Sequence, residues 1–264
     1  MQSVLITGTS SGIGEATVKT FLDDGWNVVA TARDAAAAFG GIAHPRLLAA
    51  RLDVTEPDSI AAAFNAAEQR FGALDLVVNN AGVGLGGPLE SVRLDQVRDH
   101  LEVNLIGVIA VCQQAIARFR EQERGMIINV TSLTGRVGIP FLSPYCAGKF
   151  AVEGLTESLY YELLPFGVRV KLVEPGGARS RFAHIWSENP AYSPQADTVR
   201  EAMVRGGEQA PPASEVAKAI LTAAKDSGER LRYASSSSSS MLRLHRLLPE
   251  RAFRKLVAKA FGLN

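Results

Sequence analysis

The sequence predicts an α/β fold, a doubly wound parallel sheet with helices on both faces that forms a single domain. Short β-branched runs alternate with longer helical patterns along most of the 264 residues. Runs such as residues 126–130 are apolar throughout, which indicates strands buried on both faces, as in parallel sheets. A glycine-rich turn at residues 7–14 joins the first apolar run to the first helical pattern.

The expected elements alternate from the N-terminus onward. Strands are expected at residues 4–6, 27–31, 47–52, 74–78, 126–130, 168–173 and near 230–233. Helices are expected from the glycine turn to about residue 24, then at about 57–71, 94–123, 145–164 and 214–225. Right-handed crossovers between such strands produce the doubly wound sheet.

Composition and charge argue against several classes of protein. A net charge of +1, with 47% hydrophobic and 21% charged residues, gives no reason to expect a nucleic-acid partner. Cys112 and Cys146 suit a reducing compartment, and no apolar run approaches the roughly 18 residues of a membrane span. A strand pattern starts at once and leaves no room for a signal peptide. We expect a cytoplasmic protein without membrane contact. The four histidines lack metal-ligand spacing, so no metal is expected.

Residues 182–212 break the alternation, because they are rich in Pro, Ala, Gly and polar residues and show no clean period. Four of their side chains are candidates for lining an apolar pocket or for ordinary packing: Phe182, Ile185, Trp186 and Tyr192. Further candidates for the pocket wall are Leu85, Leu133, Val137 and Phe141.

The end of the chain differs in composition from the rest. Residues 235–240 are six serines, a low-complexity run that predicts a flexible loop. A basic amphipathic tail follows to residue 264. Its apolar stripe is expected to pack on the parent domain, with contact to a membrane or a partner as the alternative. The chain is therefore divided into a main domain at 1–233 and a Ser-rich loop and tail at 234–264.

The glycine turn is the first candidate site. Glycines here permit a tight turn and close approach of the backbone to a pyrophosphate, while the following helix offers free N–H groups and a partial positive charge. The spacing Gly8-x-x-x-Gly12-x-Gly14 departs from the commoner G-x-G-x-x-G, and no Walker A lysine follows. On its own, an ordinary turn between strand and helix is the alternative.

The end of the second expected strand bears on which dinucleotide is bound. Ala32 stands where an acid for the ribose 2′-OH of NAD is expected, and Arg33 follows, whose guanidinium suits a 2′-phosphate. A solvated surface arginine is the alternative, and Asp34 favours NAD if it faces the ribose. We interpret Asp34 as the N-cap of the next helix. Asp53, after the third strand, is a candidate acceptor for the adenine amino group or a simple turn residue.

A tyrosine, a lysine and a serine form the candidate catalytic group. Tyr145 and Lys149 are four residues apart on an expected helix and share one face. A nearby cation lowers the pKa of a phenol toward neutrality, which suits general acid–base catalysis. Ser132 follows the strand at 126–130, at the edge where open α/β sheets bind ligands. By composition alone, Thr131 and Ser143 are rivals to Ser132.

Further motifs stand in order with these residues: Asn79-Asn80-Ala81-Gly82, Asn104 and Pro175-Gly176. Together they resemble the compact, single-domain branch of the short-chain dehydrogenase/reductase family, over residues 1 to about 180. The resemblance implies a Rossmann fold and hydride transfer between nicotinamide and a carbonyl or alcohol carbon. It makes Tyr145 the general acid in reduction and base in oxidation.

The resemblance makes residues 1–233 a dinucleotide-binding catalytic domain. It places residues 182–212 over the substrate, so we predict a mobile lid over an apolar pocket, and hence a hydrophobic substrate.

The resemblance also assigns the remaining roles. Lys149 would lower the pKa of Tyr145 and bind the nicotinamide ribose, Ser132 would position the carbonyl, and Asn104 would hold a water that links Lys149 to solvent. The residues implied to bind NADP(H) are Gly8, Ser10, Ser11, Gly12, Ile13, Gly14, Arg33, Asp53, Val54, Asn80, Ala81, Gly82, Tyr145, Lys149, Pro175, Gly176, Ala178 and Ser180.

The leading function is therefore an NADP(H)-dependent oxidoreductase of a hydrophobic ketone, aldehyde or secondary alcohol. A 3-ketoacyl-type reductase is an alternative, for which Arg179 and Arg181 supply basic residues. An NADP(H)-binding regulator without turnover is the alternative from another class. The resemblance also implies a homodimer or homotetramer formed through the expected helices at 94–123 and 145–164.

Overall fold

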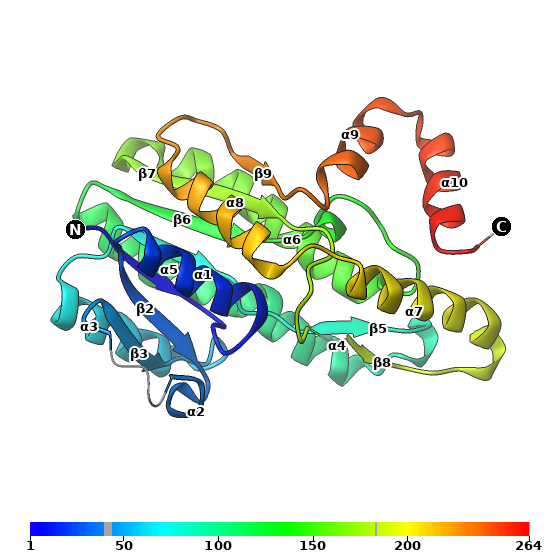
Figure 1. Cartoon of the computed structure of the whole chain (residues 1–264), viewed down its shortest axis with the longest axis horizontal. Helices are drawn as coiled ribbons and strands as arrows, with labels where there is room; N and C mark the ends of the chain where they lie inside the picture. The colour runs from blue at the N-terminus through cyan, green and yellow to red at the C-terminus, as the bar shows by residue number, and fades with distance from the viewer. Residues whose placement is uncertain (40–43, 183, 264) are drawn as a thin grey trace.

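The computed structural model describes residues 1–39, 44–182 and 184–263, so residue 183 of the predicted lid and residue 264 of the tail lie outside the described residues. Seven parallel strands form the central sheet in the order β3-β2-β1-β4-β6-β7-β9 (Figure 1). Their bounds are β1 (Ser3–Ile6), β2 (Asn27–Ala32), β3 (Leu47–Arg51), β4 (Leu76–Asn79), β6 (Gly125–Val130), β7 (Val168–Glu174) and β9 (Arg232–Ala234). The predicted doubly wound, Rossmann-type sheet is confirmed.

Helices cover both faces of this sheet (Figure 1). One face carries α1 (Gly12–Asp23) and α8 (Ala213–Lys225), and the other carries α3 (Pro57–Phe71), α5 (Gly107–Glu121) and α6 (Ser143–Leu163). Alternate strand residues serve opposite cores, since Val4 and Ile6 pack toward α1 while Leu5 packs toward α3 and α5. Burial on both faces explains why these strands are apolar throughout.

The order of strands reverses between β1 and β4. From β1 the chain proceeds outward to β2 and β3, and after β4 it proceeds in the opposite direction to β6, β7 and β9. Loops at the carboxyl ends of β1 and β4 therefore diverge and leave a crevice between them. In open α/β sheets this crevice binds the ligand.

The helical stretch predicted at residues 94–123 is not one uniform helix. It consists of α4 (Leu94–Leu101), a π-helical turn (Glu102–Ile106) and α5. By length and composition Leu94–Glu121 would suffice to cross a membrane, with a hydropathy of 1.3 in its most apolar window. No stretch of this kind was expected from the sequence. Part of this stretch is apolar because it packs in the core: Val111 and Phe119 of α5 are fully buried against the sheet.

The segment predicted as a mobile lid contains regular elements that its sequence pattern did not indicate. It contains β8 (His184–Trp186), which pairs in parallel with β5 (Gly84–Gly86), and the 16-residue helix α7 (Ser193–Glu208). Helix α7 buries only Ala196 and Val199. Because so few residues face the core, the sequence of α7 shows no apolar stripe of the kind that predicts a helix.

The serine run is not a flexible loop either. Ser235 and Ser238 are buried, and the Ser238 hydroxyl donates to the backbone carbonyl of Glu174 at the end of β7. Ser235 Oγ accepts from the backbone N–H of Gly176 at 3.3 Å. Serine is required here because its small side chain fits a tight turn and satisfies backbone groups that would otherwise be buried without partners.

The hydrogen bond from Ser238 to the Glu174 carbonyl is expected to stabilise the fold. Replacing Ser238 with Ala leaves the Glu174 carbonyl without this donor and is expected to lower the free energy of unfolding by about 1–2 kcal/mol. Urea unfolding followed by circular dichroism measures the difference. Ser240→Ala, at an exposed position of the same run, is the matched control and should change little. If Ser238→Ala lowers the free energy of unfolding no more than Ser240→Ala does, the Ser238 hydroxyl does not have this structural role.

After the serines the chain forms α9 (Ser239–Leu247) and α10 (Glu250–Ala260), at the upper right of Figure 1. Phe253 and Val257 of α10 are buried against Val137, which follows β6. The apolar stripe of the tail thus packs on the domain, beside the loop that carries Ser132.

Candidate active site

The glycine turn lies at the carboxyl end of β1, in the crevice of the sheet. Gly8 and Gly12 have φ angles of +68° and +61°, a backbone conformation that side chains disfavour. A Cβ on Gly14 would lie 2.2 Å from the carbonyl oxygen of Gly8. The turn therefore folds back on the first turn of α1 so closely that no side chain fits at Gly14, and backbone N–H groups at such a helix start are suited to bind a pyrophosphate.

The strand end after β4 holds this turn in place. Asn80 Nδ2 donates to the backbone carbonyls of Thr7 and Gly8 at 2.9 and 3.0 Å. Thr7 Oγ1 accepts from the backbone N–H groups of Asn80 and Ala81, both at 3.0 Å. Asn79 points the other way, where its Nδ2 donates to the side-chain oxygen of the buried Asn129 at 2.8 Å. Asn80 is thus the residue that supports the nucleotide turn.

The first turn of α1 is free to bind an anion. Its N-cap, Ser11, is extended and makes no side-chain capping bond, so the N–H groups that follow lack this acceptor. Beside it lies a hollow of about 290 Å³ lined by Ser10, Ala32, Arg33, Asp34, Ala37 and Ala38. These features fit a dinucleotide, with the pyrophosphate at the helix and the adenosine ribose in the hollow.

The residues at the end of β2 divide as the sequence suggested. Asp34 Oδ1 accepts from the backbone N–H of Ala37 at 2.9 Å, so the N-cap prediction is confirmed. Arg33 is exposed and reaches the same hollow. Burial alone would raise the pKa of Asp53, but hydrogen bonds from Thr55, together with Arg33 and Arg51, lower it below its usual value.

Two residues of the predicted nucleotide site also pack in the core. Val54 is buried against α5, where a Cβ on Gly107 would lie 2.7 Å from its side chain. Ala178 packs against the core on the α1 side of the sheet. Their side chains therefore contribute to packing.

Tyr145 lies near the start of α6 and is 8% exposed. Burial raises the pKa of its phenol to about 12, while the facing hydroxyls of Ser132 and Thr134 oppose this shift. Ser132 caps the short helix after β6 and accepts from the backbone N–H of Thr134 at 3.1 Å. The rivals to Ser132 lie elsewhere: Thr131 Oγ1 donates to Glu153, and Ser143 is exposed.

Lys149 stands one helical turn behind Tyr145, but the net shift of the tyrosine pKa is upward, not downward as the sequence predicted. Its Nζ donates to the backbone carbonyl of Val130 at 3.2 Å and lies 5.9 Å from the centre of the Tyr145 ring. Burial lowers the pKa of Lys149 itself to about 8. In this state burial of the phenol outweighs the influence of the ammonium group.

Asn104 occupies the π-helical turn and is 1% exposed. Its Nδ2 donates to the carbonyls of Val83 and His100 at 2.9 and 3.0 Å, and its Oδ1 accepts from the Val83 N–H at 3.2 Å. A Cβ on Gly82 would approach both Asn104 Oδ1, at 2.8 Å, and Lys149 Nζ, at 3.8 Å. The structure thus brings Asn104 and Lys149 to the same glycine.

Two histidines that the sequence analysis did not single out flank Tyr145. The ring centres of His100 and His184 lie 5.8 and 5.2 Å from that of Tyr145. Burial lowers the pKa of both, for His100 to about 4, so both are neutral near pH 7. No sequence signal marks them, because they come from α4 and β8 and meet only in the fold.

The segment after β7 crosses the entrance to this site. A Cβ on Gly12 would lie 2.9 Å from Ser180, and Arg181 donates to the Ser10 carbonyl at 3.1 Å. The ring of Phe182 lies 6.0 Å from that of Tyr145. Pro175 and Gly176 therefore lead the chain from the sheet onto the glycine turn and then over Tyr145.

A family model described as short chain dehydrogenase matches residues 2–191. The chain belongs to this family. The resemblance to short-chain dehydrogenases that the sequence indicated is confirmed.

Two relatives show how far the likeness extends. An uncharacterised oxidoreductase from Schizosaccharomyces pombe is 40% identical over 196 residues, which cover 72% of this chain and 66% of that protein. A 3-ketodihydrosphingosine reductase from Bacteroides thetaiotaomicron is 38% identical over 181 residues, 69% of this chain and 65% of that protein. The match therefore spans just under two thirds of the length of each relative.

A solved structure matches nearly the whole chain. The short-chain dehydrogenase from Streptomyces avermitilis is 30% identical and aligns with a TM-score of 0.82, over 98% of this chain and 95% of that one. Solved structures that share the fold include complexes with NADH, NAD and NADP. The fold alone thus does not select one dinucleotide.

Proposed function

We propose that this short-chain dehydrogenase transfers a hydride between NADP(H) and a hydrophobic carbonyl or secondary alcohol, with Tyr145 as the general acid and base. The observation that carries the proposal is that Tyr145 is buried between Ser132 and Lys149, beside a glycine turn that fits a dinucleotide. The nicotinamide, when bound, supplies or accepts the hydride. The protein supplies alignment and the proton.

In the direction of reduction each residue has a distinct task. The Ser132 hydroxyl holds the substrate carbonyl oxygen near the Tyr145 hydroxyl. A phenol with a pKa near 12 keeps its proton at neutral pH and donates it as negative charge develops on that oxygen. The Lys149 ammonium stabilises the phenolate that remains. In oxidation the same groups act in reverse, and Tyr145 accepts the proton.

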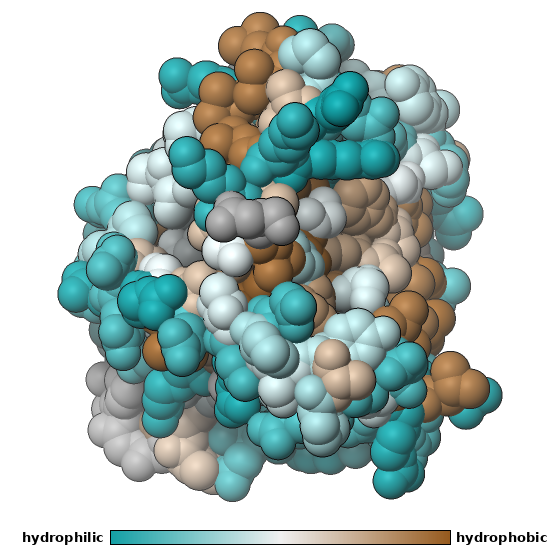
Figure 2. Space-filling view, turned by 90° about the vertical axis from the view of Figure 1, so that its right-hand side faces the viewer, coloured by the Kyte–Doolittle hydropathy of each residue, from teal (hydrophilic) through white to brown (hydrophobic). Residues whose placement is uncertain are grey.

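The surroundings of Tyr145 support an apolar substrate. Apolar side chains pack around it from three segments: Ile139, Leu142, Cys146, Trp186 and Met203. Figure 2 looks onto this end of the molecule and shows apolar side chains behind a hydrophilic rim. A relative named for a ketosphingoid substrate is consistent with this chemistry. A panel of long-chain and aromatic ketones, aldehydes and alcohols, followed by nicotinamide absorbance, tests the proposal, which fails if none reacts.

The preference for NADP(H) is proposed to rest on Arg33. Its guanidinium lines the hollow beside Ser10, where it suits a 2′-phosphate. Arg33→Ala is expected to lower kcat/KM with NADPH by roughly 10-fold or more, corresponding to about 1.4 kcal/mol or more, and to leave NADH kinetics unchanged. Steady-state kinetics with both nucleotides measures this. If the ratio of kcat/KM with NADPH to kcat/KM with NADH is unchanged in this variant, Arg33 does not determine the preference.

A 3-ketoacyl reductase is the second candidate within the same chemistry. It is favoured by the exposed Arg179 and Arg181 at the crossing segment, and a structure with 27% identity is a 3-ketoacyl-(acyl-carrier-protein) reductase from Brucella melitensis. Arg181, however, already donates to the Ser10 carbonyl. An acyl-carrier-bound ketone that reacts much faster than the free ketone would favour this candidate.

A homo-oligomer is proposed to form through the helices at α4, the π-helical turn and α6. Large apolar side chains are exposed there, as Leu94, Ile106 and Phe150 are 70%, 45% and 46% exposed. An apolar surface of this kind is typical of a contact with a second copy.

A further inference from the structure

Four titratable residues lie on one face of α6, each one helical turn after the last: Tyr145, Lys149, Glu153 and Glu157. The reaction proposed above uses the first two. Glu153 is 5% exposed, although acidic side chains are rarely buried without a partner. The buried carboxylate of Glu153, one helical turn after Lys149, therefore requires polar partners that stabilise its charge.

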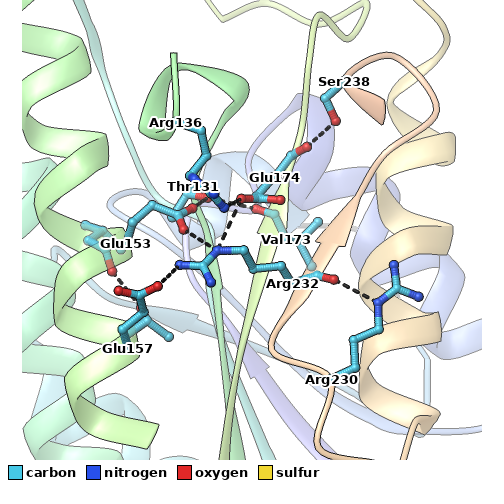
Figure 3. A network of polar contacts seen from close by, with 11 residues as sticks. Thr131, Arg136, Glu153, Glu157, Val173, Glu174, Arg230, Arg232 and Ser238 are labelled. Atoms are coloured by element: carbon cyan, nitrogen blue, oxygen red, sulfur yellow. Dashed lines mark hydrogen bonds and ion pairs between the residues drawn. The ribbon is translucent and has the colours of Figure 1, made fainter. Parts of the chain in front are cut away.

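Both carboxylate oxygens of Glu153 accept hydrogen bonds from side chains, as Figure 3 shows. Oε1 accepts from Thr131 Oγ1 at 2.6 Å, and Oε2 accepts from Arg232 Nε at 3.0 Å. Thr131 directly follows β6 and precedes Ser132, and Arg232 comes from β9. The carboxylate is thus fixed in both position and orientation.

Arg232 joins this carboxylate to a second one. Its Nε also lies 3.5 Å from Oε1 of Glu174, which accepts from Arg136 at 3.1 Å. Glu174 is 3% exposed and directly precedes the Pro175-Gly176 turn. The cluster (Figure 3) therefore links α6, the loop that carries Ser132 and the segment that crosses the site.

The charged groups around Lys149 and Glu153 come from every neighbouring element. They are Glu157 on α6, Arg136 after β6, Glu174 on β7 and Arg232 on β9, while the buried His100 faces Lys149 from α4. Burial lowers the pKa of Lys149, and the charge of Glu153 opposes that shift. Burial raises the pKa of Glu153, with Glu174 adding to it, whereas Thr131 and Arg232 lower it.

We infer that Glu153 is a positioning residue for catalysis that acts through Lys149: oriented by Thr131 and Arg232 one helical turn behind Lys149, its carboxylate keeps charged the ammonium group that the Val130 carbonyl holds beside Tyr145. Its kinetic consequence rests on the proposed function. The charge state of Lys149 requires neither substrate nor cofactor, so the two proposals can fail separately.

Glu153→Gln tests this inference, because it keeps the shape and an oxygen for Thr131 while removing the charge. The pKa of Lys149 is expected to fall by roughly one unit, since an opposite charge nearby has been removed. A titration of ¹³C-labelled lysine side chains in the cofactor-free protein measures it, with the Lys149 signal identified by its loss in Lys149→Arg. In the enzyme assay, the alkaline limb of the reduction rate moves by the same amount to lower pH.

Two further variants separate charge from structure. Glu157→Gln removes a contact to the same Arg232 from a residue whose side chain is 54% exposed, and is expected to leave the Lys149 titration unchanged. Thr131→Val removes the bond that lowers the Glu153 pKa, so it is expected to shift Lys149 in the same direction as Glu153→Gln. Should Glu153→Gln or Thr131→Val only lower Tm and leave the Lys149 titration at the wild-type value, the inference is wrong.

Discussion

Replacing Tyr145 with Phe is expected to lower kcat for carbonyl reduction by roughly 10²–10⁴-fold, the range that a general acid contributes. The substitution removes the only phenol that the structure, over its described residues, places against Ser132 and Lys149. The ring remains, so its packing against His184 and Phe182 is preserved. NADPH binding, measured by nucleotide fluorescence, is therefore expected to stay close to that of wild type.

Tyr161→Phe is the matched control for this experiment. Tyr161 lies on the same helix but is 71% exposed, so its hydroxyl has no role in the site. Full activity of this variant beside an inactive Tyr145→Phe assigns the loss to one hydroxyl. An NADPH-binding regulator without turnover predicts instead that wild type and both variants are equally inactive. A Tyr145→Phe variant that keeps wild-type kcat would overturn the acid–base role.

The fold was predictable because the sheet is buried on both faces. Strands such as β6 then read as continuous apolar runs, and glycines at the end of β1 mark a turn that no side chain tolerates. The pairing of Tyr145 with Lys149 and Ser132 was predictable for a similar reason. Helical spacing brings the first two together, and the carboxyl edge of the sheet delivers the third.

The remaining parts depend on contacts that sequence patterns do not encode. The serine run resembles a linker, yet Ser238 satisfies the Glu174 carbonyl, a partner 64 residues away in the chain. The π-helical turn arises where Asn104 bonds to Val83, and only the fold brings these two together. The pKa of Tyr145 was expected to be lowered by the neighbouring cation, but burial of the phenol, which a sequence pattern does not show, raises it instead.

Gly14→Ala is expected to weaken NADPH binding by at least roughly tenfold and to destabilise the fold by about 1–3 kcal/mol. Its new Cβ would lie 2.2 Å from the Gly8 carbonyl oxygen and 2.7 Å from Asn80 Nδ2. The turn must therefore move away from α1, which separates the backbone N–H groups from the position that they share around a pyrophosphate. Fluorescence titration with NADPH and urea unfolding measure the two effects.

Gly206→Ala separates this effect from that of a glycine lost from any helix. Gly206 lies within α7, and a Cβ there would have no heavy atom within 4 Å among the described residues. Alanine should stabilise that helix by roughly 0.5–1 kcal/mol and leave NADPH affinity unchanged. If Gly14→Ala bound NADPH as tightly as Gly206→Ala does, the close approach of the turn to α1 would not be what holds the nucleotide. The anion site would then have to be sought in side chains such as Arg33 and not in the backbone.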